Sequence, residues 1–339
     1  MHPPEWLDPA ANVDRLRVGE RLLLSRSPEM ERVRELCAQA AGSRRPVLIT
    51  GETGTGKELV ARLLHTQGSF EREPFIAVNC AAFPAHLMED EIFGHKRGAF
   101  TDARSDRAGK IASAAQGSLF FDEIGELPLE FQAKLLRLLQ ENTYSMLGSD
   151  QELRAECRFL FATNRDIADL VARNLFRLDL YYRISVFEIQ LPPLRNRRSE
   201  IAPLVRYFVL RYAAELGLEP PGFEESALSA LVAYDWPGNI RELENVSYRL
   251  LAGRNLEMIR LTDLPAAIQQ ALFVNPRLKV AAAEGLPSGT FDELMEARAR
   301  SLIQQALAQA GGNKAAAARL LGMKRTRLLY QMKELGLDL

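Results

Sequence analysis

The sequence of 339 residues contains little cysteine and no long hydrophobic run. Its three cysteines, Cys37, Cys80 and Cys157, lack the spacing of a metal or redox site, and so few thiols suit a reducing compartment. No run approaches the ~18 apolar residues of a membrane-spanning helix, and the N-terminus has no apolar segment of a signal peptide. These absences predict a cytoplasmic protein with no membrane partner.

Histidine and net charge are also scarce. The four histidines show no ligand spacing, so we interpret them as ordinary core or surface residues rather than as a metal site. The 43 Lys and Arg residues nearly balance the 44 Asp and Glu residues, so any basic patch for a nucleic acid must be local. The length allows two or three domains, and 47% apolar residues are enough for substantial cores.

A glycine-rich loop stands between a predicted strand and a predicted helix. Residues 47–49 are a short apolar run, residues 51–57 read GETGTGK, and a helical pattern follows from Glu58. This order is typical of a phosphate-binding loop, in which glycines let backbone N–H groups turn towards the phosphates and the helix N-terminus adds positive charge. We expect Lys57 to reach the β- and γ-phosphates. The strict pattern has Ser or Thr where this chain has Glu58, and a glycine-rich turn with an unrelated lysine is the alternative.

An acidic pair ends a second predicted strand, SLFFDEI at residues 118–124. Asp122 at the carboxyl end of a strand can hold Mg²⁺, and Glu123 can polarise an attacking water. Such a strand is common by chance, but much less so about 65 residues after a phosphate-binding loop. The sequence therefore predicts nucleotide hydrolysis, with a nucleotide site formed by Gly51, Glu52, Thr53, Gly54, Thr55, Gly56, Lys57, Glu58 and Asp122.

The rest of the first 194 residues alternates strands with helices. Further strands are predicted at 75–78, 158–164 and 185–191. Helices are predicted at 28–37, with Ser27 as the N-cap, at 84–93 and at 131–141, which favours a parallel sheet covered on both faces. Asn164, at the end of its strand, could orient the attacking water. Asparagine is also common in the turns that end strands, which is the alternative. From residue 195 to 268 strands disappear, and the patterns at 201–216, 224–234 and 239–251 predict an all-helical domain.

The segment GHKRGAFTDA at residues 94–103 has two glycines and mixed charge, so we expect it to form an irregular loop. Phe100 is an aromatic residue at a polar loop tip and needs a partner. The alternative is a loop whose Phe100 folds back on its own domain.

The C-terminal block predicts a helix-turn-helix. A long helix at 291–310 is followed by Gly311-Gly312, a helix at 314–321 capped by Asn313, a turn, and a last helix at 324–335. From residue 311 onward the sequence contains six basic residues and only two acidic ones, so the block is locally basic. A charged face on a solvated bundle is the alternative. The long helix suits pairing of two copies, and hence a palindromic operator.

These motifs together resemble those of bacterial enhancer-binding proteins, over residues 25–339. GETGTGKE is similar to the family's phosphate loop, which itself has Glu after Lys, and GHKRGAFTDA resembles the family's GAFTGA loop. LYYRISVFEI, WPGNIRELEN and GGNKAAAARLLGMKR also match. The resemblance implies an AAA+ ATPase that activates RNA polymerase carrying sigma-54, followed by a Fis-type helix-turn-helix.

The implied fold class is an α/β AAA+ P-loop NTPase with a parallel sheet and an α-helical lid, plus a C-terminal all-α domain. The expected domains are a short extension at 1–24, the α/β ATPase subdomain at 25–194, the lid at 195–271, a linker at 272–289 and the DNA-binding domain at 290–339. The implied cofactors are ATP and Mg²⁺.

The resemblance also assigns roles in hydrolysis. Lys57 binds phosphate, Asp122 supports Mg²⁺ and Glu123 activates water. The other assigned residues are Asn79, which holds Glu123 back until the loop engages its target, Asn164 and Arg241, the first and second sensors, and Arg177 and Arg183, arginine fingers that enter the neighbouring subunit's site.

The implied partners are the sigma-54 RNA polymerase holoenzyme, double-stranded enhancer DNA and further copies of the chain, from a dimer to a hexameric ring. Phe100 and Thr101 are expected to contact sigma-54. The residues expected at DNA are Lys314, Lys324, Arg325, Thr326, Arg327 and Gln331. Hydrolysis in the family drives loop movement that opens the promoter.

Three departures from the family pattern matter. Asp102 replaces the second glycine of the loop, and Arg327 and Gln331 stand where the family more often has Thr and Lys. No receiver domain precedes the ATPase, which predicts either a shortened chain or a member controlled by a separate protein in trans, as in the phage-shock type. Two alternatives follow: a DNA-binding ATPase that no longer engages sigma-54 because of Asp102, and an AAA+ chaperone or protease subunit, which the DNA-binding block argues against.

Overall fold

The chain divides into two compact units, Met1–Val274 and Asn275–Leu339. The structure is a computed structural model, and it describes residues 14–18, 21–25, 27–68, 70–101, 103–253, 256–274, 303, 310, 313–320, 323, 328 and 332. Among these residues, no helix has the length and the apolar character needed to cross a membrane.

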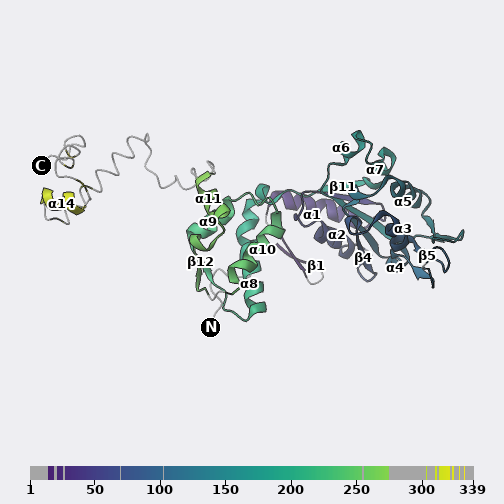
Figure 1. The fold of residues 1–339 in the computed structure, drawn as a ribbon, viewed down its shortest axis with the longest axis horizontal. Helices are drawn as coiled ribbons and strands as arrows, with labels where there is room; N and C mark the ends of the chain where they lie inside the picture. The colour runs from purple at the N-terminus through teal and green to yellow at the C-terminus, as the bar shows by residue number, and fades with distance from the viewer. Residues whose placement is uncertain are drawn as a thin grey trace. The chain divides into compact units, whose positions relative to one another are not determined.

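A five-stranded parallel sheet forms the centre of the first unit, as the alternation of strands and helices predicts (Figure 1). Its strand order is β11-β3-β10-β7-β4, and every pairing in it is parallel. The strands are β3 (Val47–Thr50), β4 (Phe75–Asn79), β7 (Ser118–Asp122), β10 (Arg158–Thr163) and β11 (Phe187–Gln190). Because the strands are parallel, the residues that follow β3, β4, β7 and β10 all lie at one edge of the sheet.

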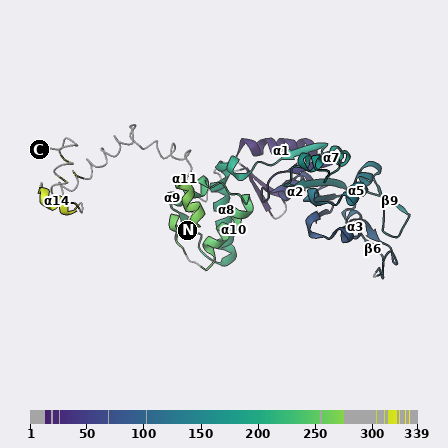
Figure 2. The same ribbon diagram turned by 45° about the horizontal axis from the view of Figure 1, so that its top comes forward.

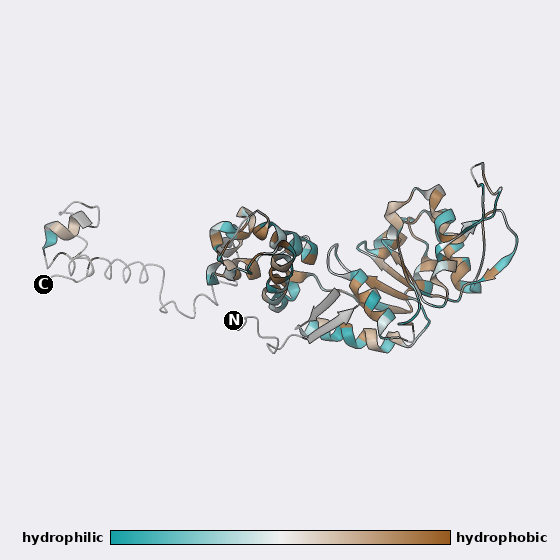
Figure 3. Cartoon of the chain, turned by 90° about the horizontal axis from the view of Figure 1, so that it is seen from below, coloured by the Kyte–Doolittle hydropathy of each residue, from teal (hydrophilic) through white to brown (hydrophobic). Residues whose placement is uncertain are grey.

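Both faces of this sheet are buried, because alternate residues of each strand point to opposite sides. Leu48 and Phe121 belong to one core, whereas Val47 and Phe120 belong to the core on the other face. Figure 3 shows the hydrophobic strands enclosed between helices with hydrophilic outer faces. Helices α1 (Pro28–Ala41) and α2 (Lys57–Thr66) cover one face, and α3 (Ala85–Phe93), α5 (Leu129–Glu141) and α7 (Leu178–Ile184) cover the other.

The predicted start of the first helix is confirmed. Ser27 is the N-cap of α1, its side chain accepts a hydrogen bond from the N–H of Met30 at 3.3 Å, and Pro28 is the first helical residue. The short N-terminal extension contains an antiparallel pair that we did not predict, β1 (Asp14–Val18) with β2 (Arg21–Ser25).

The second part of this unit is mainly helical and has its own core. Its helices are α8 (Ile201–Leu216), α9 (Glu225–Ala233), α10 (Asn239–Leu251) and α11 (Ala266–Val274). The expectation that strands are absent here was wrong, because β12 (Gly222–Phe223) pairs with β13 (Met258–Ile259). The linker was predicted to begin at residue 272, but α11 continues to Val274. We call residues 195–274 the lid.

The predicted loop at 94–103 begins with regular structure, which corrects the expectation of an irregular segment. Gly94–His95 is a two-residue strand, β5, that pairs with β6 (Arg107–Ala108). Gly94 has φ of +77°, and a Cβ there would lie 2.3 Å from the carbonyl oxygen of Arg107, so the pairing requires glycine. A second hairpin, β8 (Thr143–Ser145) with β9 (Glu152–Arg154), lies beside the loop (Figure 2), through a bridge between His95 and Leu147.

Several short elements have too few residues for a periodic pattern and were not predicted. They are α4 (Lys110–Ala114), α6 (Ile167–Ala172) and the single turns η2 (Cys80–Ala82), η3 (Ile124–Glu126), η4 (Leu194–Asn196), η5 (Arg198–Glu200) and η6 (Leu261–Asp263). Tertiary contacts rather than periodicity decide such elements.

The second unit contains the predicted helix after Gly311-Gly312. This helix is α14 (Lys314–Leu320), and the side chain of Asn313 caps it by accepting from the N–H of Ala316 at 3.2 Å. Ala317 and Ala318 are buried in a small core with Ile303, Leu328 and Met332. The predicted helices at 291–310 and 324–335 lie mostly outside the described residues.

A buried arginine joins the sheet to the ends of two helices. Arg158, the first residue of β10, is 0% exposed, and its guanidinium donates to the carbonyl oxygens of Ala40 at 2.7 Å, Ala41 at 3.2 Å and Leu64 at 3.2 Å. These carbonyls belong to the last turns of α1 and α2, where acceptors lack helical partners and a positive charge is favourable.

We expect Arg158→Met to destabilise the protein by about 3 kcal/mol or more, because it removes the guanidinium donors from three buried carbonyl groups. Chemical denaturation monitored by circular dichroism measures this. Arg137→Met is the control: that side chain is 70% exposed and pairs with Glu141 on the helix surface, so we expect a change below about 1 kcal/mol. Equal stabilities of the two variants would contradict the assigned role of Arg158.

Candidate functional site

The loop between β3 and α2 has the backbone conformation of a phosphate cradle. Gly51, Gly54 and Gly56 have φ of +150°, +79° and +102°, a region that other residues rarely adopt. A Cβ at Gly54 would lie 2.3 Å from the carbonyl oxygen of Gly238, so there is no room for a side chain. The loop leads directly into the N-terminus of α2, where N–H groups and the helix dipole favour an anion. These residues fit a nucleotide phosphate.

Lys57 lies at the end of this loop, as the first residue of α2. Its side chain is buried, and Nζ donates to the carbonyl oxygens of Gly51 at 2.9 Å and Glu52 at 3.2 Å. Burial lowers the pKa of Lys57, and the nearby carboxylates of Glu123 and Asp122 act against that shift. The ammonium group is therefore held by carbonyl groups at the loop itself.

The two acidic residues stand where β7 ends. Burial raises the pKa of Asp122, and the charge of Lys57 opposes this effect. A half-buried carboxylate beside a phosphate cradle fits Mg²⁺, which proteins bind through one or two carboxylates together with substrate phosphates. Glu123 has φ of +55°, an uncommon conformation for a residue with a side chain and one that is found at functional sites.

Asn164 connects the acidic pair to the loop. Its backbone N–H donates to Oε2 of Glu123 at 3.3 Å, and its side-chain Nδ2 donates to Oγ1 of Thr53 at 2.8 Å. Asn164 follows β10, which lies between β3 and β7 in the sheet. The fold thus brings together the loop, Glu123 and Asn164, three features that are spread over more than 100 residues of the sequence.

Asn79 and Arg241 also lie near this edge of the sheet. Asn79 ends β4 directly opposite Asp122, and its Oδ1 accepts a hydrogen bond from the N–H of Ala81 at 2.9 Å. The expected restraint of Glu123 by Asn79 stays a prediction, because the carboxylate of Glu123 bonds to Asn164 in this structure. Arg241 lies in the first turn of α10, and its positive charge acts to lower the pKa values of both Lys57 and Asp122.

The two predicted arginine fingers have partners within their own chain. Arg177 forms an ion pair with Asp179 at 2.7 Å. Arg183 donates from Nε and Nη2 to the carbonyl oxygen of Leu139, at 3.1 and 2.6 Å. It lines a pocket of about 670 Å³ with residues that precede β3, β7 and β10, at the sheet edge opposite the phosphate cradle. Arg183 therefore lies at the opposite edge of the sheet from the phosphate cradle of its own chain.

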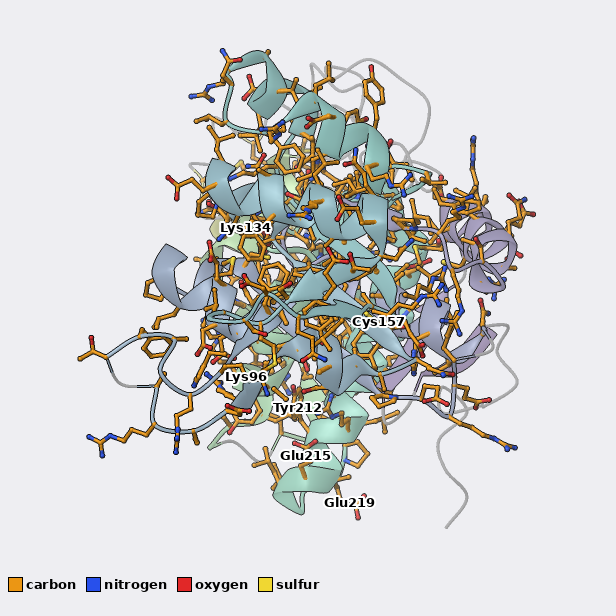
Figure 4. All side chains as sticks on the ribbon, turned by 90° about the vertical axis from the view of Figure 1, so that its right-hand side faces the viewer. Lys96, Lys134, Cys157, Tyr212, Glu215 and Glu219 are labelled. Atoms are coloured by element: carbon orange, nitrogen blue, oxygen red, sulfur yellow. The ribbon has the colours of Figure 1, made fainter. Side chains whose placement is uncertain are left out.

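The tip of the 94–103 loop is a compact turn. The N–H of Gly98 donates to the carbonyl oxygen of Ala103 at 2.8 Å, and Lys96, labelled in Figure 4, donates to Asp106 at 2.6 Å. Phe100 is 45% exposed but packs edge-on against the ring of His95, with centroids 4.9 Å apart. Phe100 thus rests partly on its own domain, as the alternative interpretation predicted, while Thr101 is exposed. Asp102 lies outside the described residues.

Of the predicted DNA contacts, only Lys314 is described, as the half-exposed first residue of α14. Lys324, Arg325, Thr326, Arg327 and Gln331 lie outside the described residues.

Sequence reasoning missed three polar residues of the lid that contact the phosphate cradle: Arg195, Arg197 and Asn239. The carboxylate of Glu52 binds Arg195, and the expected place of Glu52 among the nucleotide-binding residues stays a prediction. The available signals were the arginines of PPLRNR and the asparagine of WPGNIRE, two segments far from the cradle in sequence.

Comparison with known proteins identifies three segments of the chain. A model of the sigma-54 interaction domain matches residues 23–190, one of the AAA+ ATPase lid domain matches 195–278, and one of the Fis family of bacterial regulatory proteins matches 296–335. The chain is similar to the regulatory protein AtoC of Escherichia coli, with 41% identity over 318 residues that cover 93% of this chain and 68% of AtoC. The transcriptional regulator NtrC of Azospirillum brasilense is 40% identical, covering 93% of this chain and 70% of NtrC.

A solved structure that is similar to this chain is NtrX from Brucella abortus in complex with ADP. It is 31% identical, with a TM-score of 0.68 over 93% of this chain and 70% of NtrX. The parallel-sheet AAA+ fold with a lid and the nucleotide-binding activity are thereby confirmed.

We expect Lys57→Ala to abolish nucleotide binding and Glu123→Gln to retain binding while hydrolysis falls by about 10²-fold or more, because phosphate contact and water activation are separate tasks. Fluorescent ADP binding and phosphate release measure the two steps. Glu130→Gln, at an exposed position in the first turn of α5, should change neither. Equal losses of affinity in the first two variants would contradict this division of roles.

Proposed function

Because the chain belongs to the family of sigma-54-dependent transcriptional activators, which combine ATP hydrolysis with DNA binding, we propose that hydrolysis at the cradle moves the 94–103 loop and so remodels the closed complex of sigma-54 RNA polymerase. The observation that carries this proposal is a short path through the fold. β4 ends at Asn79 beside Asp122, and the same segment continues through η2 and α3 directly into the loop at Gly94.

Contacts at the end of this path support the transmission of movement. Asp90, on α3, bonds to Nδ1 of His95 at 2.5 Å and to Arg107 at 3.0 Å. His95 in turn packs against Phe100. A shift of α3 therefore reaches the side chain that we propose to contact sigma-54, together with Thr101. A buried hydrogen-bonded cluster is suited to this because packed elements move as units rather than deforming smoothly.

In the proposed site, Lys57 and the loop bind the phosphates, Asp122 holds Mg²⁺ that neutralises charge on them, and Glu123 positions the attacking water. Asn164 and Arg241 sense the γ-phosphate, since the first bonds to both Thr53 and Glu123 and the second lies near Lys57. Asn79 restrains Glu123 until the loop engages its target.

We further propose that each site is completed by a neighbouring copy in a hexameric ring. Arg183 supports this because it lies at the opposite edge of the sheet from its own cradle. Arg177 is exposed and is the second candidate. An arginine finger stabilises charge on the transferred phosphoryl group and contributes about 10³–10⁵ in rate.

The proposed DNA contacts divide into two kinds. Lys314 and Lys324 hold phosphates, and Arg325 and Arg327 reach base edges from the start of the last helix, with Thr326 and Gln331 beside them. The second unit would bind a palindromic enhancer as a dimer, and a separate protein acting in trans would supply regulation.

We expect Arg183→Ala to bind ATP normally but to hydrolyse it about 10³-fold more slowly. A mixture with Lys57→Ala protein should recover activity, because Lys57→Ala subunits still supply Arg183 to intact cradles. Arg173→Ala, which removes a surface pair with Asp169, is the control and should stay fully active. No recovery in mixtures, together with specific activity that stays flat on dilution of the unmodified protein, would contradict a shared site.

We expect the protein to bind sigma-54 in the presence of ADP and a metal fluoride, and Thr101→Ala to lose this binding. Size-exclusion chromatography of the complex measures it. Asp102→Gly tests the alternative function, because aspartate adds charge and tolerates positive φ less readily than glycine does. A complex that forms only with Asp102→Gly would mean that the unaltered chain is a DNA-binding ATPase that no longer engages sigma-54.

A further inference from the structure

The lid contacts the phosphate cradle through the loop's carbonyl groups. Nδ2 of Asn239 donates to the carbonyl oxygen of Thr53 at 3.0 Å, and the N–H of Ile240 donates to that of Gly54 at 3.0 Å. Nη2 of Arg197 donates to that of Thr55 at 2.9 Å. Three consecutive carbonyl groups of the cradle thus accept hydrogen bonds from residues that lie more than 140 positions later in the chain.

These contacts decide which way the loop's N–H groups point. All described peptide bonds are trans, and a trans peptide holds its C=O and N–H on opposite sides. When the carbonyls of Thr53 and Thr55 point to the lid, the N–H groups of Gly54 and Gly56 must point away from it, towards the inside of the cradle. Glycine backbones have many accessible conformations, so this orientation has to be imposed by partners.

The carboxylate of Glu52 holds the lid donors in place. Arg195 binds it through two hydrogen bonds, at 2.8 and 2.6 Å, and Nδ2 of Asn239 donates to it at 3.2 Å. Asn239 is fully buried, and its Oδ1 also accepts from the N–H of Leu194 at 2.8 Å, so its amide has one orientation. The hydrogen bonds from Arg195 lower the pKa of Glu52, which keeps the carboxylate ionised. We call Glu52, Arg195 and Asn239 the lid clamp.

We propose that the lid clamp positions the phosphate cradle, so that nucleotide affinity depends on Arg195 and Glu52 although neither side chain binds the phosphates. The proposal rests on the nucleotide-binding role of the cradle. Glu52 is suited to positioning rather than to direct binding, because its negative charge would repel a phosphate. The paired side chains of Arg195 and Glu52 are 39% and 42% exposed, and so exposed a pair contributes little to folding stability. The two hydrogen bonds from Arg195 instead fix the orientation of the Glu52 carboxylate.

The test is Arg195→Met in the full chain. We expect the Kd for a fluorescent ADP analogue and the KM for ATP to rise about tenfold, since a charge-assisted bond orients the loop. We expect kcat at saturating ATP to change less than about twofold, because Glu123 and Asn164 are untouched. The melting temperature should stay within about 2 °C of that of the unmodified protein.

Two further variants separate positioning from a merely structural role. Arg211→Met is the matched control, because Arg211 is 44% exposed and pairs with Glu215 on the lid surface at 3.0 Å; its Kd should be unchanged. Arg195→Lys should recover part of the affinity. In a double-mutant cycle, the variant with both Glu52→Gln and Arg195→Met should bind ADP no more weakly than the more affected single variant, because both substitutions remove the same interaction.

Affinity for ADP that is equal in Arg195→Met and Arg211→Met would overturn the proposal, as would additive losses of affinity in the double-mutant cycle. A loss of affinity accompanied by a fall in melting temperature well beyond about 2 °C would also overturn it. A different result, in which the unmodified protein itself binds no ADP analogue, would overturn the nucleotide site and the lid clamp with it. Direct binding therefore distinguishes failure of the clamp from failure of the proposed function.

Discussion

The orientation of a few peptide groups in the glycine loop is the constraint on which the rest of the structure depends. A phosphate is bound by N–H groups only if the carbonyl groups of the same peptides find partners elsewhere. Here Lys57 satisfies the carbonyls of Gly51 and Glu52, and the lid satisfies those of Thr53, Gly54 and Thr55. The α/β part and the lid are therefore joined at the site where the chemistry takes place, and Gly54 must be glycine because the backbone at Gly238 lies against it.

The parallel sheet explains why so many functional groups meet at one edge. Glu123, Asn164 and the glycine loop each follow a strand, and parallel strands end together. The same arrangement places Arg183 at the opposite edge, away from its own phosphate cradle. It also places the end of β4 only two short helices, η2 and α3, before the loop that carries Phe100.

Much of the fold and site could be predicted from the sequence because the signals are local. The glycine loop between a strand and a helix, the N-cap at Ser27 and the acidic end of β7 all appear within a few residues. The two-residue strands β5 and β6 could not be predicted, because pairing of so short a segment depends on the partner and not on periodicity. Arg195 and Asn239 escaped for a similar reason: nothing in their own segments shows that they bind Glu52.

By itself the sequence determined the family of this protein, its division into an ATPase and a DNA-binding block, and the groups that we propose to bind and hydrolyse ATP. It could do so because those groups lie in contiguous motifs, whose residue types and spacing are visible in the sequence. The tertiary structure alone decided how the glycine loop is held, which arginine pairs with which acid, and how far Phe100 leaves its own domain. These depend on hydrogen bonds between segments that the chain separates widely, and such contacts exist only once the sheet and the lid have folded together.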